Sequence, residues 1–212
     1  EQRGRRVVRQ EHDGRLSVSA ESWQGKRLNS PNDVVVAADG AIWFTDPDYG
    51  ILSEYEGAKA ESEIGRCQVY RVDPISGQVD CVADDFVKPN GLAFSRDGRK
   101  LYVADTGASH DPNGPRHIRV FDVIDDGKRL GRSQVFAECT DGLFDGFRVD
   151  RDERLWTSAG NSVHIYNHDG VLIGKLHLPE VVANLQFGGD KGNILYICAT
   201  RSLYHCRLAI CG

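Results

Sequence analysis

One repeated segment constrains this chain more than any other feature. It occurs four times, as PNDVVVAADGAIWFTD from Pro31, PNGLAFSRDGRKLYVAD from Pro89, FDGFRVDRDERLWTSAG from Phe144 and ANLQFGGDKGNILYICAT from Ala183. In each copy a turn residue lies seven positions after a polar anchor residue, and a large apolar residue lies eleven positions after it. The anchors are Asn32, Asn90, Asp145 and Asn184. A segment that recurs with both offsets preserved indicates one structural unit repeated along the chain.

Each repeat continues into a second hairpin. Short runs rich in Val, Ile, Tyr, Trp and Phe alternate with Asp-Gly and Asn-Gly turns, and no segment shows a sustained helical period. The second hairpins cover residues 68–84, 117–138 and 162–178; residues 6–21 have the same form, and 202–210 begin another copy. Two hairpins per repeat make a four-stranded sheet, the blade of a β-propeller. The sequence therefore predicts a single all-β propeller domain over residues 1–212, with no helix across 31–46 or 89–105.

The number of blades follows from how a propeller closes. The chain opens on an outer hairpin with no inner hairpin before it, and the last repeat lacks a full outer pair. A propeller removes its sheet edges by closing its ring. We therefore expect a six-bladed propeller from which roughly the first one and a half blades are absent in this chain, for blades of about 45 residues. A four-bladed ring closed by this chain alone is the alternative.

The anchors and the long connections are expected on one face. The inner strand of each blade starts beside the central channel, so the four anchors should converge at one mouth of it. The connections 46–65 and 105–116 rise on that same face, and long ordered loops at one end of a scaffold commonly bind ligands. Tyr49 is a candidate wall of the binding site, although ordinary loop packing explains it equally well. For His110 and His117 we expect a loop-ordering or surface role and no part in catalysis.

The residue types at the anchors favour a hard cation. Carboxylate and amide oxygens that converge on an axis suit calcium, which takes 6–8 oxygen ligands in loose geometry. We expect one divalent cation, with Asn90 and Asp145 as its ligands, Asn32 close by and Asn184 as a weaker candidate. Calcium is the favoured ion, and zinc and magnesium are alternatives. For any single anchor, an Asx turn at the start of a strand is a sufficient explanation.

Composition narrows the class of partner. Lys and Arg number 26 against 31 Asp and Glu, which gives a net charge of −5, and no basic tract is present. Nucleic-acid binding is therefore not expected, and the apolar runs are too short for a membrane span. Six scattered cysteines without C-x-x-C spacing disfavour structural zinc and favour a reducing compartment. We expect a cytoplasmic protein that acts on a small molecule; because the chain does not begin with Met, periplasmic and secreted locations remain alternatives, and its oligomeric state is open.

Three stretches carry a family resemblance. LNSPNDVVVAADGAIWFTDPDYGI, KPNGLAFSRDGRKLYVADTGASHDPNGPRHIRVFDV and DGFRVDRDERLWTSAGNSVHIYNHDG resemble the gluconolactonase branch of the SMP-30/gluconolactonase/luciferin-regenerating-enzyme family, and the similarity runs over essentially the whole chain. The resemblance implies a six-bladed propeller with one divalent cation, commonly calcium, that hydrolyses sugar-acid lactones such as glucono-1,5-lactone. It implies that Asn90 and Asp145 are metal ligands and that Asn32 contacts the substrate near or on the metal. In the mechanism we expect, Asp145 also activates water.

The chain departs from the family pattern at three places. The glutamate of an E-G-P motif, which supplies a further metal ligand in the family, has no counterpart, and Ser30 stands where some members carry a substrate-binding Arg. Glu153 occupies the turn position where Gly is usual, which would cost about 1 kcal/mol if that position requires a positive φ. A non-catalytic propeller that serves as a binding platform and a phosphotriesterase-like hydrolase with the same cation are the alternative functions.

Overall fold

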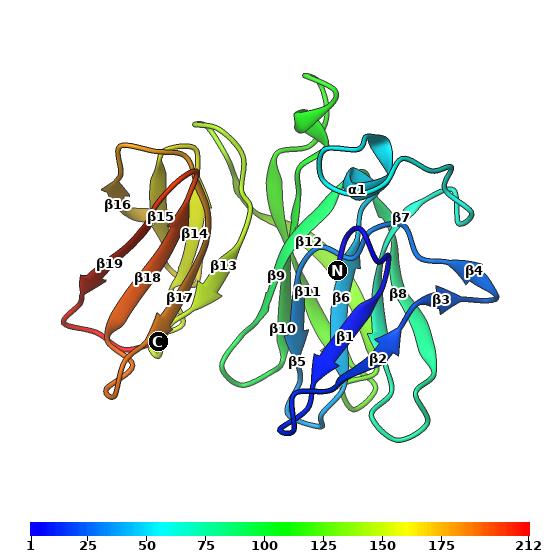
Figure 1. The fold of residues 1–212 in the computed structure, drawn as a ribbon. Coiled ribbons are helices and arrows are strands. Elements are labelled where there is room, and N and C mark those ends of the chain that lie inside the picture. The colour runs from blue at the N-terminus through cyan, green and yellow to red at the C-terminus, as the bar shows by residue number, and fades with distance from the viewer.

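The computed structural model describes all residues 1–212 and is built almost entirely of antiparallel sheets (Figure 1). Three sheets have four strands and the last has three, and we name them blades A to D in chain order. Blade A contains β5 (Val34–Val36), β6 (Ile42–Asp46), β7 (Cys67–Val72) and β8 (Val79–Phe86). Blade B contains β9 (Pro89–Phe94), β10 (Lys100–Asp105), β11 (His117–Ile124) and β12 (Arg129–Glu138). Blade C contains β13 (Phe147–Val149), β14 (Leu155–Ala159), β15 (Ser162–Tyr166) and β16 (Leu172–His177), and blade D contains β17 (Val182–Gly188), β18 (Ile194–Ala199) and β19 (Leu203–Arg207).

The predicted repeats coincide with the blades. Every repeated segment forms the two inner strands of its blade, and the predicted second hairpins form the outer strands. The opening hairpin pairs β1 (Val7–Gln10) with β2 (Leu16–Ala20), and a small ribbon pairs β3 (Ser22–Trp23) with β4 (Lys26–Arg27). The prediction of an all-β propeller arrangement is confirmed.

Helix is confined to the two long connections. α1 (Tyr49–Leu52) lies between β6 and β7, and the 3₁₀ turn η1 (Gly107–Ser109) lies between β10 and β11. No helix crosses residues 31–46 or 89–105, as expected. None of the helical segments combines the length and the apolar character that crossing a membrane requires.

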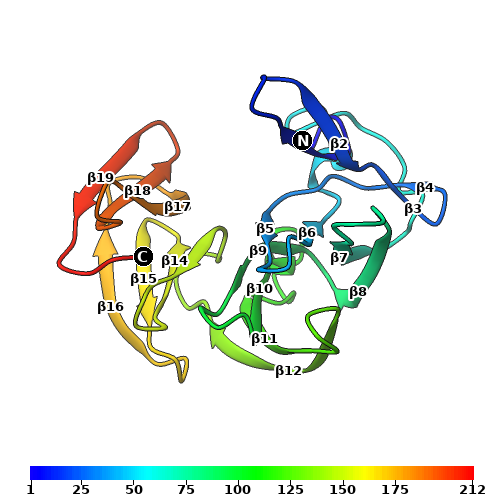
Figure 2. The same cartoon turned by 90° about the horizontal axis from the view of Figure 1, so that it is seen from below.

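The blades follow one another in chain order around a common centre, as an open arc (Figure 2). The opening hairpin lies at one end of the arc and blade D at the other, and the two belong to separate sheets. Residues 1–212 therefore do not close a four-bladed ring. The six-blade count remains a prediction.

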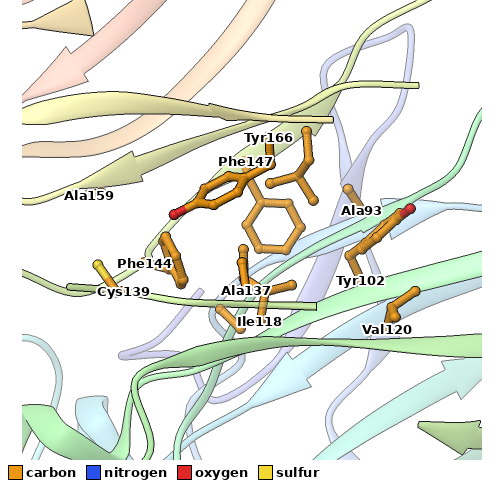
Figure 3. Close-up of a cluster of buried hydrophobic side chains, with 12 residues drawn as sticks. Ala93, Tyr102, Ile118, Val120, Ala137, Cys139, Phe144, Phe147, Ala159 and Tyr166 are labelled. Carbon is orange, nitrogen blue, oxygen red and sulfur yellow. The ribbon is translucent and has the colours of Figure 1, made fainter. Parts of the chain in front are cut away.

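Apolar side chains fill the space between successive blades. Blades B and C share the largest cluster, in which Phe144, Phe147 and Tyr166 face Ile118 and other side chains of blade B (Figure 3). Comparable clusters join blade A to B around Trp43, and blade C to D around Trp156. Each fully buried side chain of this size contributes about 1.5–3 kcal/mol through removal of its surface from water. The blades are thus held to one another by a continuous series of cores, which fixes where their inner strands begin.

Two buried aspartates hold the segments that lead into blades A and B. Asp46, at the end of β6, accepts hydrogen bonds from the amides of Asn29 and Ser30, both at 2.8 Å. Asp105, at the end of β10, accepts equivalent bonds from Val87 and Lys88, both at 2.9 Å. Both pairs of amides lie just ahead of an anchor residue. These carboxylates therefore fix the backbone that carries Asn32 and Asn90.

The turn of blade C places a non-glycine residue at a positive φ. Glu153 has φ +60°, whereas Gly40 and Gly98 occupy the same turn position of blades A and B with φ +86° and +69°. A non-glycine residue at such a φ costs roughly 1 kcal/mol. The turn lies at the opposite end of the inner strands from the anchors.

Candidate active site

A cavity of about 710 Å³ opens where the inner strands begin. Three anchor residues line it, namely Asn32, Asn90 and Asp145. The long connections supply a second group of lining residues, which are Tyr49, Glu56, Thr106, Ser109 and His110. The remaining lining residues are Gln2, Gly142, Leu143, Phe144, Gly160, Val181 and Val182. Four of the five residues proposed from the sequence thus meet at one cavity, together with both long connections.

Close contacts between neighbouring blades bring the anchors together. The Thr45 hydroxyl donates to the carbonyl of Asn90 at 2.7 Å and accepts from the amide of Asp33 at 3.1 Å, so it joins blades A and B. Between blades B and C, a Cβ added at Gly91 would lie 2.0 Å from the carbonyl oxygen of Asp145. Only glycine permits that approach. The anchors are therefore positioned by the blade-to-blade packing and not by the loops.

Asn184 lies outside this cavity. Its Oδ1 accepts a hydrogen bond from the adjacent amide of Leu185 at 2.8 Å. Its side chain packs on Gly146, where an added Cβ would lie 2.1 Å from the amide carbon and Oδ1. In this position Asn184 fills the junction between blades C and D, and it is not among the residues that line the cavity with Asn90 and Asp145.

The amide of Asn90 has one partner on the nitrogen side and none on the oxygen side. Asn90 is 8% exposed, and its Nδ2 donates to the hydroxyl of Thr106 at 3.4 Å. Its Oδ1 is buried without a hydrogen-bond partner. Buried polar atoms are rarely left unpartnered, because the lost hydration costs about 1–3 kcal/mol. An unpartnered oxygen in a cavity is therefore suited to an external cation or donor.

Asp145 is held in an unfavourable electrostatic environment. Burial, which is the largest cause, and the neighbouring carboxyls of Asp33 and Glu56 together raise the pKa of its carboxyl to about 7, while the nearby Asn90 amide acts in the opposite direction. Its backbone amide donates to the hydroxyl of Ser158 at 2.9 Å, which fixes the main chain. Burial and acidic neighbours disfavour the ionised form of this carboxyl, and a bound cation would favour it.

The donor chemistry fits a hard divalent cation. Asp145 offers carboxylate oxygen and Asn90 offers the unpartnered amide oxygen, with Asn32 on the same cavity. The structure contains no group of three or more His, Cys, Asp and Glu side chains arranged to hold a metal. A site here would depend on amide oxygens, which suit calcium or magnesium better than a thiolate- or imidazole-preferring ion.

The loop wall of the cavity is a connected set of hydroxyls. The Tyr49 hydroxyl lies 2.5 Å from that of Thr106 and 3.3 Å from that of Ser109. The Ser109 hydroxyl is hydrogen-bonded to Nδ1 of His110 at 2.8 Å, and the His110 ring lies 5.6 Å from the Tyr49 ring. Tyr49 thus stands in the wall as proposed. Thr106 and Ser109 were not recognisable from sequence, and for His110 only a loop-ordering role was expected.

Ser30 explains one departure from the family pattern. It is fully buried, its hydroxyl donates to the carbonyl of Pro47 at 2.6 Å, and it accepts from the amide of Gly50 at 2.9 Å. It therefore ties the start of blade A to α1. A side chain without a hydroxyl at this position would lose both hydrogen bonds.

Glu56 is the functional candidate that sequence reasoning missed. It lines the cavity from the connection between β6 and β7, and its carboxyl forms no hydrogen bond or ion pair within the chain. The next residue, Gly57, packs so closely that an added Cβ would lie 2.1 Å from the carbonyl oxygen of Gly50. The loop is thereby held against α1. The only sequence feature that could have indicated Glu56 is that it is an acidic residue in a long connection.

Replacing Glu56 by glutamine should lower the pKa of Asp145 in protein freed of divalent cations, because one of the carboxyls that raises it is removed. The measurement is a carboxyl-carbon NMR titration of Asp145. Glu61→Gln is the matched control, since Glu61 is an exposed residue of the same loop that does not line the cavity. An Asp145 titration that is identical in wild type and Glu56→Gln would contradict the assigned electrostatics.

Comparison with known proteins shows which family the chain belongs to. The model of the SMP-30/Gluconolactonase/LRE-like region matches residues 1–201. The chain belongs to this family. The gluconolactonase of Zymomonas mobilis is 32% identical over 205 residues, which are 92% of this chain and 55% of that protein. A lactonohydrolase of Aspergillus oryzae is 27% identical over 199 residues, which are 86% of this chain and 45% of that protein.

A solved structure of the same family shares the fold closely. The gluconolactonase of Xanthomonas campestris superposes with a TM-score of 0.89 at 39% identity, over 97% of this chain and 66% of that one. The chain thus spans about half the length of the curated relatives and two thirds of this structure.

Proposed function

We propose that the protein is a divalent-cation-dependent hydrolase that opens sugar-acid lactones such as glucono-1,5-lactone. The observation that carries the proposal is the convergence of Asn32, Asn90 and Asp145 on one cavity, with the Asn90 oxygen unpartnered. Membership of a family whose similar members include gluconolactonases supports the choice of substrate.

Asn90 and Asp145 would hold the cation, with Asn32 close by, and calcium is the ion that this donor set favours. When bound, such a cation would polarise the lactone carbonyl and stabilise negative charge that develops on its oxygen. Asn184 is not included, because its side chain is occupied at the junction of blades C and D.

Asp145 would act as the general base. One carboxylate oxygen can accept a proton from the attacking water, and the burial that raises its pKa makes it more basic than an ordinary carboxylate. A bound cation works against this by favouring the ionised form. A weak base is sufficient for an activated sugar lactone, which is intrinsically reactive.

The other cavity residues would bind and orient the lactone. The amides of Asn32 and Asn90 can donate to, or accept from, the attacking water and the ring hydroxyls. Tyr49 and His110 present adjacent rings on the loop wall. These rings can pack against the C–H face of the sugar and so reduce the access of bulk water.

A substrate comparison tests the proposal against both alternatives. We expect the protein, supplied with calcium, to accelerate hydrolysis of glucono-1,5-lactone well above the spontaneous rate, and to show a lower kcat/KM for an aryl phosphotriester. Protein-free reactions at each pH provide the control, because sugar lactones also open without catalysis. A higher kcat/KM for the phosphotriester would favour the phosphotriesterase alternative, and no acceleration of either substrate would favour a binding platform.

A further inference from the structure

The orientation of the Asn90 amide decides whether the cavity receives an oxygen or an NH₂ group. A side-chain amide can take two orientations that differ by a half-turn, and its hydrogen-bond partners determine which one is stable. The acceptor on the nitrogen side of Asn90 is the Thr106 hydroxyl, at 3.4 Å.

The single proton of the Thr106 hydroxyl already has partners other than Asn90. The hydroxyl lies 3.2 Å from the carbonyl oxygen of Lys88, to which it donates, and 2.5 Å from the Tyr49 hydroxyl. A hydroxyl carries one proton and two lone pairs. With its proton directed to Lys88 or Tyr49, Thr106 retains a lone pair that accepts from Asn90. Rotating the amide by a half-turn would place Oδ1 against the Thr106 oxygen, whose proton is already directed to another partner.

Thr106 itself has little freedom to move. It is 2% exposed, and its amide donates to the carbonyl of Lys88 at 3.0 Å. Its carbonyl accepts from the amide of Ser109 at 2.9 Å, at the start of η1. The Lys88 ammonium forms an ion pair with Asp48 and lies 5.6 Å from the centre of the Tyr49 ring. The hydroxyl of Thr106 is therefore held in one position between the loop wall and Asn90.

We propose that Thr106 is a positioning residue that orients the Asn90 amide, so that Oδ1 faces the cavity and is available to the divalent cation. The inference rests on the proposed function for the identity of the bound group. It assigns the role from the hydrogen bonds of Thr106 to Lys88, Tyr49 and Asn90, and from the unpartnered state of the Asn90 oxygen. Thr106 acts through Asn90 and takes no part in the proton transfer.

Calcium binding without substrate tests the proposal. Thr106→Val keeps the shape of the side chain and removes the hydroxyl, whereas Thr106→Ser restores the hydroxyl. Partners that orient metal ligands typically contribute 10–100-fold to affinity, so we expect Thr106→Val to weaken calcium binding by about 10–100-fold and Thr106→Ser to remain within about threefold of wild type. Affinity is measured by isothermal titration calorimetry with calcium chloride, and folding of each variant by thermal unfolding in chelator.

Thr157→Val is the matched control. Thr157 is a fully buried threonine of blade C whose hydroxyl donates only to the carbonyl of Ser158 at 3.0 Å. The calcium affinity of the Thr157→Val variant should therefore equal that of wild type. Wild-type affinity in Thr106→Val, or an equal loss in Thr106→Ser, would overturn the positioning role, as would the absence of calcium binding by wild type. If calcium binding follows the expected order and no variant hydrolyses a lactone, the positioning role stands and the proposed activity fails.

Discussion

Asp145→Asn is expected to reduce kcat/KM for glucono-1,5-lactone by about 10²–10⁴-fold, the range typical for loss of general-base catalysis. The substitution preserves the size of the side chain and leaves one oxygen for a cation, but it removes the group that accepts the proton. Asp145 is also the only anchor with a carboxylate in the cavity, since the other two are asparagines. The measurement is initial-rate hydrolysis at saturating calcium, corrected for spontaneous opening.

Thermal unfolding shows whether Asp145→Asn loses activity because a catalytic group is missing or because the protein is unfolded. Because burial and acidic neighbours raise the pKa of Asp145 to about 7, far above its ordinary value, the folded state retains a proton that the unfolded state has already released. Stability is therefore lost as pH rises through about 7. In chelator, Asp145→Asn should unfold at a higher temperature than wild type at pH 8, and this advantage should shrink at pH 5.5. Wild-type activity in a folded Asp145→Asn protein would refute the assigned role.

Asp190→Asn is the matched control for this substitution. Asp190 is an exposed aspartate in the turn between β17 and β18, it makes no hydrogen bond through its side chain, and it does not line the cavity. Its replacement should leave both lactone hydrolysis and the thermal unfolding temperature unchanged.

Removal of divalent cations is expected to abolish lactone hydrolysis, and added calcium should restore it. Without a cation, Asp145, Asp33 and Glu56 leave negative charge uncompensated near the position where an oxyanion would form. The measurement is activity after exhaustive chelation, with metal content determined by mass spectrometry and with calcium-saturated chelator as the control. Separate restoration with magnesium and zinc identifies the preferred ion. Full activity in demonstrably metal-free protein would contradict the mechanism.

Calcium should also stabilise the fold in a pH-dependent manner. A ligand present at 100 times its Kd stabilises the native state by about 2.7 kcal/mol. Below about pH 7 the cation must displace the proton held by Asp145, so calcium binding weakens. The calcium-induced rise in unfolding temperature should consequently be larger at pH 8 than at pH 5.5. An equal rise at both pH values would indicate that the ion binds elsewhere.

Spacing within the repeat was sufficient to predict that Asn32, Asn90 and Asp145 lie close together, and all three line one cavity. Each lies at the start of an inner strand, and inner strands begin beside the same axis, so equivalent positions in successive blades must converge. Asn184 follows the same spacing but does not line the cavity. Its side chain packs on Gly146, and its Oδ1 accepts from the amide of Leu185. Residue spacing alone does not encode which neighbour a side chain packs against.

The all-β repeat, the blade boundaries and the anchor positions could be predicted from the amino-acid sequence, because they depend on turn residues and apolar patterning that act locally. The sequence also indicated that Tyr49 would stand on the face that carries the anchors. Three features could be seen only in the tertiary structure. Glu56 and Thr106 line the cavity, the side-chain oxygen of Asn90 has no hydrogen-bond partner, and the pKa of Asp145 is raised. The physical reason is that burial, Coulomb interactions and hydrogen-bond partners depend on distance in space, and these groups come from different blades and loops that only packing brings together.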